Sequence, residues 1–212
     1  MSQYDRTRNN NKNRPLVNRG LVIFTEGETE IVFYKRLVEF IKATNKDRKV
    51  VEHVLYKNMG GVSRFGSKPA RVLRYKVQPE HKGLSFSVAL AYDTDAFDQY
   101  RRKPPVDWKQ AKRDLREAGV KSIVEVPAKS SIEDWFLLDF DGVKKHLGLE
   151  SDTKMPPGDN GQEKIKKLFK KANRIYVKGE QCSGLVDCLD MSRICSTLVN
   201  EIAPLYKVLF YN

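Results

Sequence analysis

Acidic residues occur in three separate stretches of this sequence, each shortly after a run of apolar residues. The first stretch contains Glu26 and Glu30, the second contains Asp93 and Asp95, and the third contains Glu133. Carboxylates held close together repel one another, so their pKa values rise unless a cation neutralises them. Oxygen ligands with no His or Cys beside them suit Mg²⁺, Mn²⁺ or Ca²⁺. The stretches therefore predict a divalent-metal site if the fold brings them together.

The apolar runs have the pattern of strands in a parallel α/β sheet. Residues 21–24 form a short continuous apolar run, and further strands are predicted over 50–56, 85–92 and 121–126. Repeated alternation of strands and helices predicts a Rossmann-like α/β fold, with a central, mostly parallel sheet flanked by helices. Ligands of such sheets bind beyond the carboxyl ends of the strands, which is where the acidic stretches begin.

Helical periodicity fills the intervals between the predicted strands. Thr25 and Glu28 have the spacing of a capping box that would start the first helix, and Ser131 and Asp134 have the same relation. Tyr75 and Val199 are expected to face the core. The later helices are predicted over 68–78, 104–118, 131–147, 162–172 and 185–202.

The composition indicates a globular chain of 212 residues, with 40% hydrophobic and 31% charged residues. No apolar run approaches the roughly 20 residues of a membrane span, so no membrane partner is expected. The three cysteines, Cys182, Cys188 and Cys195, form no CxxC pair and have no secretion signal before them. We interpret them as reduced, buried thiols of a cytoplasmic protein.

Positive charge is concentrated in two parts of the chain, whose net charge is +12. Residues 1–18 form a basic arm without periodicity, and residues 161–178 are rich in lysine. This pattern favours a polyanion such as nucleic acid, although a solvated lysine-rich helix explains the second block equally well. The expected nucleic-acid contacts are Arg14, Arg19, Lys164, Lys167 and Lys171.

Two motifs resemble the Toprim family, in which one strand ends in Glu-Gly and a later strand ends in Asp-x-Asp. They occupy residues 21–30 and 88–95. The Glu-Gly-x-Thr-Glu form and the stretch 131–138 look most like the RloB-like and OLD-type Toprim nucleases of bacterial defence loci. The resemblance covers roughly residues 20–140. It implies Mg²⁺- or Mn²⁺-dependent hydrolysis of phosphodiester bonds in DNA or RNA, with tRNA among the candidates, by an anti-phage defence effector.

The resemblance also assigns roles to individual residues. Glu26, Asp93 and Asp95 match the metal and acid/base positions of the family. Glu30 and Glu133 match further acidic metal ligands of the OLD-type enzymes. Lys178, beyond a candidate fifth strand at 174–177, matches their downstream catalytic lysine. The implied division is an arm at 1–18, a Toprim catalytic core at 19–148 and a helical extension at 149–212 packed on the same core.

The sequence departs from the OLD-type pattern in one respect, because it contains no Gly-x-x-x-x-Gly-Lys-[Ser/Thr] loop. A required ATPase or sensor would therefore be a separate protein. The choice of DNA or RNA, endo- or exonucleolytic cutting, and the oligomeric state, a homodimer included, stay open.

Two other functions remain as alternatives. A haloacid-dehalogenase-like phosphatase would use Asp93 as its nucleophile, but Ala96 stands where Thr or Val is usual, and Glu26 has no role in it. A non-catalytic nucleic-acid-binding subunit of a defence complex would not need Mg²⁺. Tyr34, Tyr92 and Trp135 could stack on bases, but we interpret them as core residues.

Overall fold

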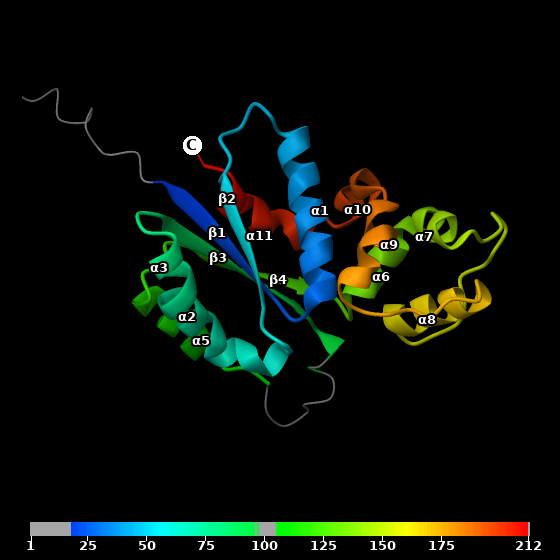
Figure 1. Cartoon of the computed structure of the whole chain (residues 1–212), viewed down its shortest axis with the longest axis horizontal. Helices are drawn as coiled ribbons and strands as arrows, with labels where there is room; N and C mark the ends of the chain where they lie inside the picture. Colours follow the sequence, from blue (N-terminus) through cyan, green and yellow to red (C-terminus); the bar gives the residue numbers. More distant parts are fainter. Residues whose placement is uncertain (1–17, 96, 98–104, 212) are drawn as a thin grey trace, which may run out of the picture.

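A four-stranded parallel sheet forms the centre of the protein (Figure 1). The computed structural model describes residues 18–95, 97 and 105–211. The strand order is β2-β1-β3-β4, and every neighbouring pair is parallel. The strands are β1 (Arg19–Thr25), β2 (His53–Asn58), β3 (Ser85–Asp93) and β4 (Ile123–Ala128). This sheet confirms the predicted Rossmann-like α/β class and is consistent with a Toprim fold.

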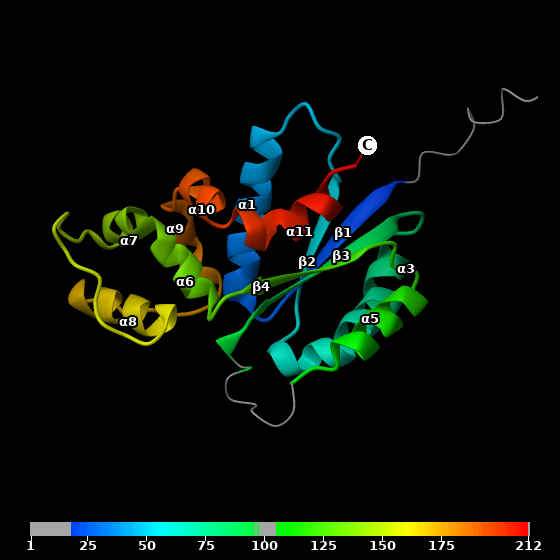
Figure 2. The same cartoon turned by 180° about the vertical axis from the view of Figure 1, so that it is seen from behind.

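Helices cover both faces of the sheet, as Figures 1 and 2 show from opposite sides. One face packs against α1 (Glu28–Thr44) and α11 (Val199–Leu209), and the other against η1 (Val62–Gly66), α2 (Lys68–Val72) and α5 (Trp108–Glu117). Successive side chains of a strand point to opposite faces. In β1 the odd-numbered apolar residues therefore enter one core and the even-numbered ones the other, which explains why the whole run is apolar.

A further group of helices lies beyond the carboxyl end of β4, at the right of Figure 1. It consists of α6 (Ile132–Phe136), η3 (Leu137–Asp139), α7 (Phe140–Leu147), α8 (Gly161–Lys171), η4 (Glu180–Cys182), α9 (Ser183–Asp187) and α10 (Met191–Thr197). The rings of Trp135 and Phe136 pack on Phe33 of α1, with centroids 5.9 and 5.6 Å from it. This aromatic contact holds α6 beside α1.

Two predicted long helices are interrupted. The capping box of Ser131 and Asp134 is confirmed, but the helix that it begins is divided into α6, η3 and α7. The predicted helix 185–202 was wrong, because Asp190 starts a new helix inside it. Its carboxylate accepts hydrogen bonds from the backbone N–H groups of Ser192 (2.9 Å) and Arg193 (3.3 Å). Val199 then begins α11 and is 60% exposed, contrary to the prediction.

The predicted helix 68–78 contains a π-helical turn, η2 (Leu73–Val77), between α2 and α3 (Gln78–Glu80). Residues four apart in a helical segment share one face, and the residue midway between them lies on the opposite face. Leu73 and Val77 are fully buried, whereas Tyr75 is 75% exposed. The prediction that Tyr75 faces the core was therefore wrong.

Three other local predictions were also wrong. The first helix has no capping box, because Thr25 ends β1 and its hydroxyl donates to the carbonyl of Gly27 (3.0 Å). Strand β2 starts at His53 rather than at residue 50, since Val50 forms an isolated bridge with Phe210. Residues 174–177 join no strand among the described residues. That segment lies outside the sheet and forms side-chain contacts with α6 instead.

The remaining organisational predictions have mixed outcomes. Cys182 is buried, but Cys188, in the turn after α9, and Cys195, in α10, are only half-buried; all three thiols are free. None of the described helices is long and apolar enough to cross a bilayer. The arm at 1–18 lies outside the described residues except for its last residue, and the boundary at 148/149 stays a prediction.

The start of α8 fits against α6 only because residue 161 is glycine. A Cβ atom on Gly161 would lie 2.3 Å from the backbone nitrogen of Asp134. We expect Gly161→Ala to destabilise the protein by about 1–3 kcal/mol through overpacking, measured by urea unfolding. Gly66→Ala is the control, because no atom lies within 4 Å of a Cβ placed there. Equal stability of the two variants would contradict close α6–α8 packing.

Candidate metal centre

The first two acidic stretches meet where β1 and β3 end. Asp93 is the last residue of β3, and Glu26 follows β1 directly. The Oε1 atom of Glu26 accepts a hydrogen bond of 2.8 Å from the backbone N–H of Asp93. Neighbouring parallel strands therefore place these carboxylates side by side, as the sequence pattern predicted.

A glycine turn after β2 fixes the backbone of Glu26 from the other side. The N–H groups of Gly60 and Gly61 donate to the carbonyl of Glu26 over 2.8 and 3.0 Å. Both glycines have positive φ values, 79° and 113°, which side-chain-bearing residues rarely adopt. Glu28 is directed to this turn as well, since its carboxylate accepts a 2.7 Å hydrogen bond from Asn58. Glu28 is therefore already partnered away from the cluster.

Two helix starts add further carboxylates. Glu30 lies in the first turn of α1, and its Oε2 atom would be 3.0 Å from a Cβ placed on Gly27. Glu133 lies in the first turn of α6 with a fully buried side chain. Asp95 follows β3, and its N–H donates to the carbonyl of Ser130 (3.0 Å), which ties it to the loop after β4. The third acidic stretch thus joins the first two.

One cation lies among these carboxylates. The Nζ atom of Lys178 is 3.2 Å from Oε1 of Glu133, and the same oxygen accepts a 3.0 Å hydrogen bond from the hydroxyl of Tyr176. Both residues lie in the short segment between α8 and η4, which thus supplies two partners to Glu133. The N–H of Gly179 donates to Thr29 (2.7 Å) and holds this segment on α1.

Tyr176 is a site residue that the sequence analysis missed. The only signal for it is its position two residues before Lys178 in the same extended segment. Burial raises the pKa of Tyr176 above its usual value, and the negative charge of Glu133 raises it further. Its phenol therefore stays protonated and acts as a hydrogen-bond donor that orients Glu133.

The proximity of the carboxylates shows in the pKa values of the two strand-end residues. Burial, followed by the negative charges of the neighbouring acidic residues, raises the pKa of Asp93 to about 9. Burial also raises the pKa of Glu26 to about 7, against the lowering effect of its hydrogen bond from Asp93. Glu30, Glu133 and Asp95 are among the charges that act on Asp93. The other four predicted carboxylates therefore lie within electrostatic range of Asp93.

The pKa values of Glu30 and Lys178 are also shifted in the directions expected beside buried carboxylates. Burial raises the pKa of Glu30, and Lys178 partly opposes that rise. Burial alone would lower the pKa of Lys178, but Glu133, Glu30 and Asp93 raise it above its usual value overall. Lys178 therefore remains protonated and supplies a fixed positive charge.

Several oxygen atoms of the cluster are buried without a hydrogen-bond partner. They are Oε2 of Glu30, Oδ1 of Asp93, Oε2 of Glu133 and the hydroxyl of Tyr34. Such atoms cost free energy unless a ligand satisfies them. As their side chains stand, no three acidic, histidine or cysteine residues in the described part of the chain close around a common ion position. The unpartnered oxygens and the all-oxygen donor set nevertheless suit a hard divalent cation such as Mg²⁺ or Mn²⁺.

The predicted nucleic-acid contacts do not gather at this centre. Arg19 begins β1, at the opposite end of the strand from Glu26, and its guanidinium lies over the ring of Tyr211. Lys167 and Lys171 bind Pro157 and Thr153 in the loop before α8. Lys164 is half-buried on α8, and Arg14 lies outside the described residues. The three aromatic residues Tyr34, Tyr92 and Trp135 are buried, which confirms their core role.

Comparisons with known proteins place the chain only loosely. No family model matches it, and no curated protein matches it either. Among solved structures it is similar to the C-terminal region of the OLD protein of Xanthomonas campestris pv. campestris. The TM-score is 0.41 and the sequence identity 13%, over 88% of this chain and 96% of that one. A likeness of this strength identifies neither a family nor an activity.

The raised pKa values predict how pH affects the metal-free protein. The unfolded chain releases the protons of Glu26 and Asp93 at the ordinary pKa values of these side chains. The folded state keeps them up to about pH 7 for Glu26 and about pH 9 for Asp93. This stabilising contribution is complete below about pH 4 and is lost as pH rises through 7 and 9. The melting temperature should therefore fall over that range in EDTA.

A bound divalent cation should reverse this loss, because it binds the ionised carboxylates. At a tenfold excess of Mg²⁺ or Mn²⁺ over Kd, the stabilisation is about 1.4 kcal/mol, or about 3–6 °C in Tm. The increase in Tm on adding the metal should become larger between pH 6 and pH 9, as measured by calorimetry. Asp93→Asn should flatten the pH dependence and abolish the metal response. A metal response that Asp93→Asn leaves intact would contradict this site.

Proposed function

We propose that this protein is a divalent-metal-dependent nuclease that hydrolyses phosphodiester bonds in nucleic acid. One observation carries the proposal, namely the convergence of buried and half-buried carboxylates, some of them unpartnered, beside a protonated lysine. The convergent residues are Glu26, Glu30, Asp93, Asp95 and Glu133, with Lys178. Negative charge of this density must be offset, either by bound protons or by bound cations.

The proposed metal ions are Mg²⁺ or Mn²⁺. Glu26, Asp93 and Asp95 would hold one, and Glu30 and Glu133 would help to hold a second. When bound, such ions neutralise phosphate charge and increase the acidity of water. Glu26 and Asp93 are pre-positioned for this role, because the 2.8 Å hydrogen bond between them fixes the two strand ends.

In the proposed reaction a water oxygen forms a bond to phosphorus while the bond to one ester oxygen breaks. The water proton passes to one of the carboxylates at the acid/base positions, and the departing oxygen takes a proton from solvent. Negative charge accumulates on the phosphate oxygens during this exchange. Lys178 would stabilise that charge, since Glu133 and Thr29 fix its segment and its raised pKa keeps it protonated.

The biological setting in this proposal comes from the motif resemblance alone. The Glu-Gly-x-Thr-Glu form at 26–30 and the Asp-x-Asp at 93–95 support an RloB-like or OLD-type Toprim nuclease. On that basis we propose a cytoplasmic anti-phage effector that acts with a separate ATPase or sensor. DNA, RNA and tRNA are all candidate substrates, and a homodimer is compatible with the proposal.

The activity can be tested with plasmid, single-stranded DNA, total RNA and tRNA, each with Mg²⁺, Mn²⁺ or EDTA. We expect metal-dependent cleavage of at least one substrate. Asp93→Ala and Glu30→Gln should each reduce the rate about 100-fold or more, since each removes charge that holds a cation. Glu28→Gln is the matched control, because that carboxylate binds Asn58 instead, and it should keep most of the activity.

Two outcomes would argue against a nuclease at this site. Cleavage that survives both EDTA and Asp93→Ala would place the activity elsewhere. Full activity of Glu26→Gln on a small phosphate monoester, without nucleic-acid cleavage, would favour the phosphatase alternative.

A further inference from the structure

A basic groove lies on the face of the molecule formed by η1, α2 and the π-turn η2. Its volume is about 570 Å³. The lining includes four cations, a serine and an exposed aromatic ring: Arg64, Lys68, Arg71, Lys76, Ser67 and Tyr75. We propose that this groove binds a single-stranded segment of the nucleic-acid substrate. The inference deepens the proposed nuclease function and rests on it.

The charge of the groove is not compensated by the protein around it. Its lining contains no acidic residue, and within the described residues none of its four cations forms an ion pair. The neighbouring Arg74, in contrast, pairs with Glu117 at 3.9 Å and donates to the carbonyl of Asp114. Arg64, Arg71 and Lys76 thus remain available to an external anion, whereas Lys68 donates to backbone carbonyls. From Lys68 to Lys76 the helical path spans roughly 12 Å, which suits several consecutive phosphates better than one.

Tyr75 decides between a single strand and a duplex. It is 75% exposed, although Leu73 and Val77 on either side of it are fully buried. The segment therefore presents one aromatic ring to solvent among the groove cations. Base stacking on such rings is open to unpaired bases, whose faces are free, whereas a duplex hides its base faces. The pairing of ring and cations favours a single strand.

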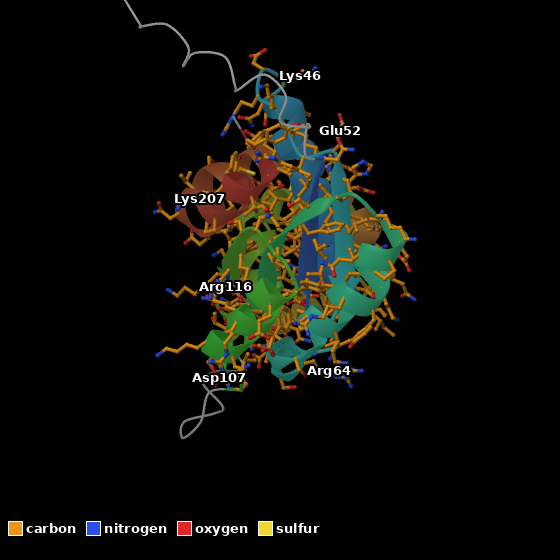
Figure 3. All side chains as sticks on the ribbon, turned by 90° about the vertical axis from the view of Figure 1, so that its left-hand side faces the viewer. Lys46, Glu52, Arg64, Asp107, Arg116 and Lys207 are labelled. Carbon is orange, nitrogen blue, oxygen red and sulfur yellow. The ribbon has the colours of Figure 1, made fainter. Side chains whose placement is uncertain are left out.

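The groove is linked directly to the candidate metal centre. Lys68 donates to the carbonyls of Met59 (2.5 Å) and Asn58 (3.4 Å), in the turn that holds the backbone of Glu26. Arg64 lies against the same turn, since its guanidinium would be 3.0 Å from a Cβ on Gly60. Figure 3 shows Arg64 at the end of the molecule opposite Lys46 and Glu52. A strand lying in the groove therefore leads toward the carboxylates.

The lysines of α8 serve as an internal comparison. Lys166 and Lys170 are exposed on α8, and their replacement removes the same charge as replacement of Arg71 and Lys76. The net charge of +12 attracts any polyanion, so only a difference between these two pairs identifies a specific surface.

Binding can be measured by fluorescence anisotropy in EDTA, where metal-dependent cleavage is stopped. Labelled single-stranded DNA, single-stranded RNA and a duplex of equal length are the probes. Arg71→Ala/Lys76→Ala should weaken single-strand binding about tenfold or more and reduce the salt slope by about 1.4. Lys166→Ala/Lys170→Ala should change affinity less than about threefold. Tyr75→Ala should weaken single-strand binding about 5–100-fold and spare the duplex, while Tyr75→Phe should bind like the wild type.

Each opposing result has a distinct meaning. Equal losses in the two charge variants would refute the groove, because net charge alone would then explain binding. A Tyr75→Ala variant that binds all probes normally, or loses duplex binding equally, would refute the single-strand assignment. Groove-dependent binding by a wild type that cleaves nothing would refute the nuclease proposal and leave the groove intact. Normal cleavage by the groove variants would refute the groove alone.

Discussion

Mutual repulsion among buried carboxylates is the constraint around which this structure is built. Asp93, Glu30 and Glu133 have almost no exposed surface, yet all three carry an oxygen without a hydrogen-bond partner. Lys178 pairs with Glu133 and partly opposes the raised pKa of Glu30, but a single positive charge cannot balance five acidic groups. Burial, followed by repulsion from the neighbouring carboxylates, raises the pKa values of Asp93 and Glu26. We propose that this arrangement is a preorganised cation-binding site, where the free energy lost in the empty state is recovered on binding.

Backbone contacts that are independent of the charges hold the carboxylates together despite their repulsion. Parallel pairing of β1 and β3 aligns their carboxyl ends, and the glycine turn at 60–61 locks the backbone of Glu26. The buried ring of Phe33 packs against Trp135 and holds the helix that carries Glu133. Because packing and backbone hydrogen bonds fix these elements, repulsion shifts proton affinities instead of separating the side chains.

The molecule combines an acidic centre with an excess of positive charge elsewhere. A nucleic acid presents negative phosphates to both, so it would be attracted by the basic surface and repelled by the empty acidic centre. Cations in that centre would remove the repulsion, and this would couple productive binding to metal. The basic groove adjoins the turn that supports Glu26, so attraction and proposed chemistry share one structural element.

Sequence alone determined the sheet and the set of acidic residues. The short apolar run at 21–24 fits a strand that is buried on both faces of a sheet. In a parallel sheet the strands end at the same edge, so Glu26 and Asp93 lie there together. These inferences hold because they depend on local periodicity and on the directionality of parallel strands. Even Lys178 was found from the motif resemblance, although the strand expected before it does not exist.

Tertiary structure decided everything that depends on side-chain partners from distant elements. Tyr176 belongs to the centre because the loop that carries it packs against α6, which no local pattern reveals. Tyr75 faces solvent because Leu73 and Val77 occupy the buried face of this segment, and only packing against the sheet decides which face that is. Glu28 and Glu30 look alike in sequence. In the structure Glu28 accepts a hydrogen bond from Asn58, whereas Glu30 is buried close to Asp93. Sequence supplies the charges, and long-range packing determines which of them remain unpaired.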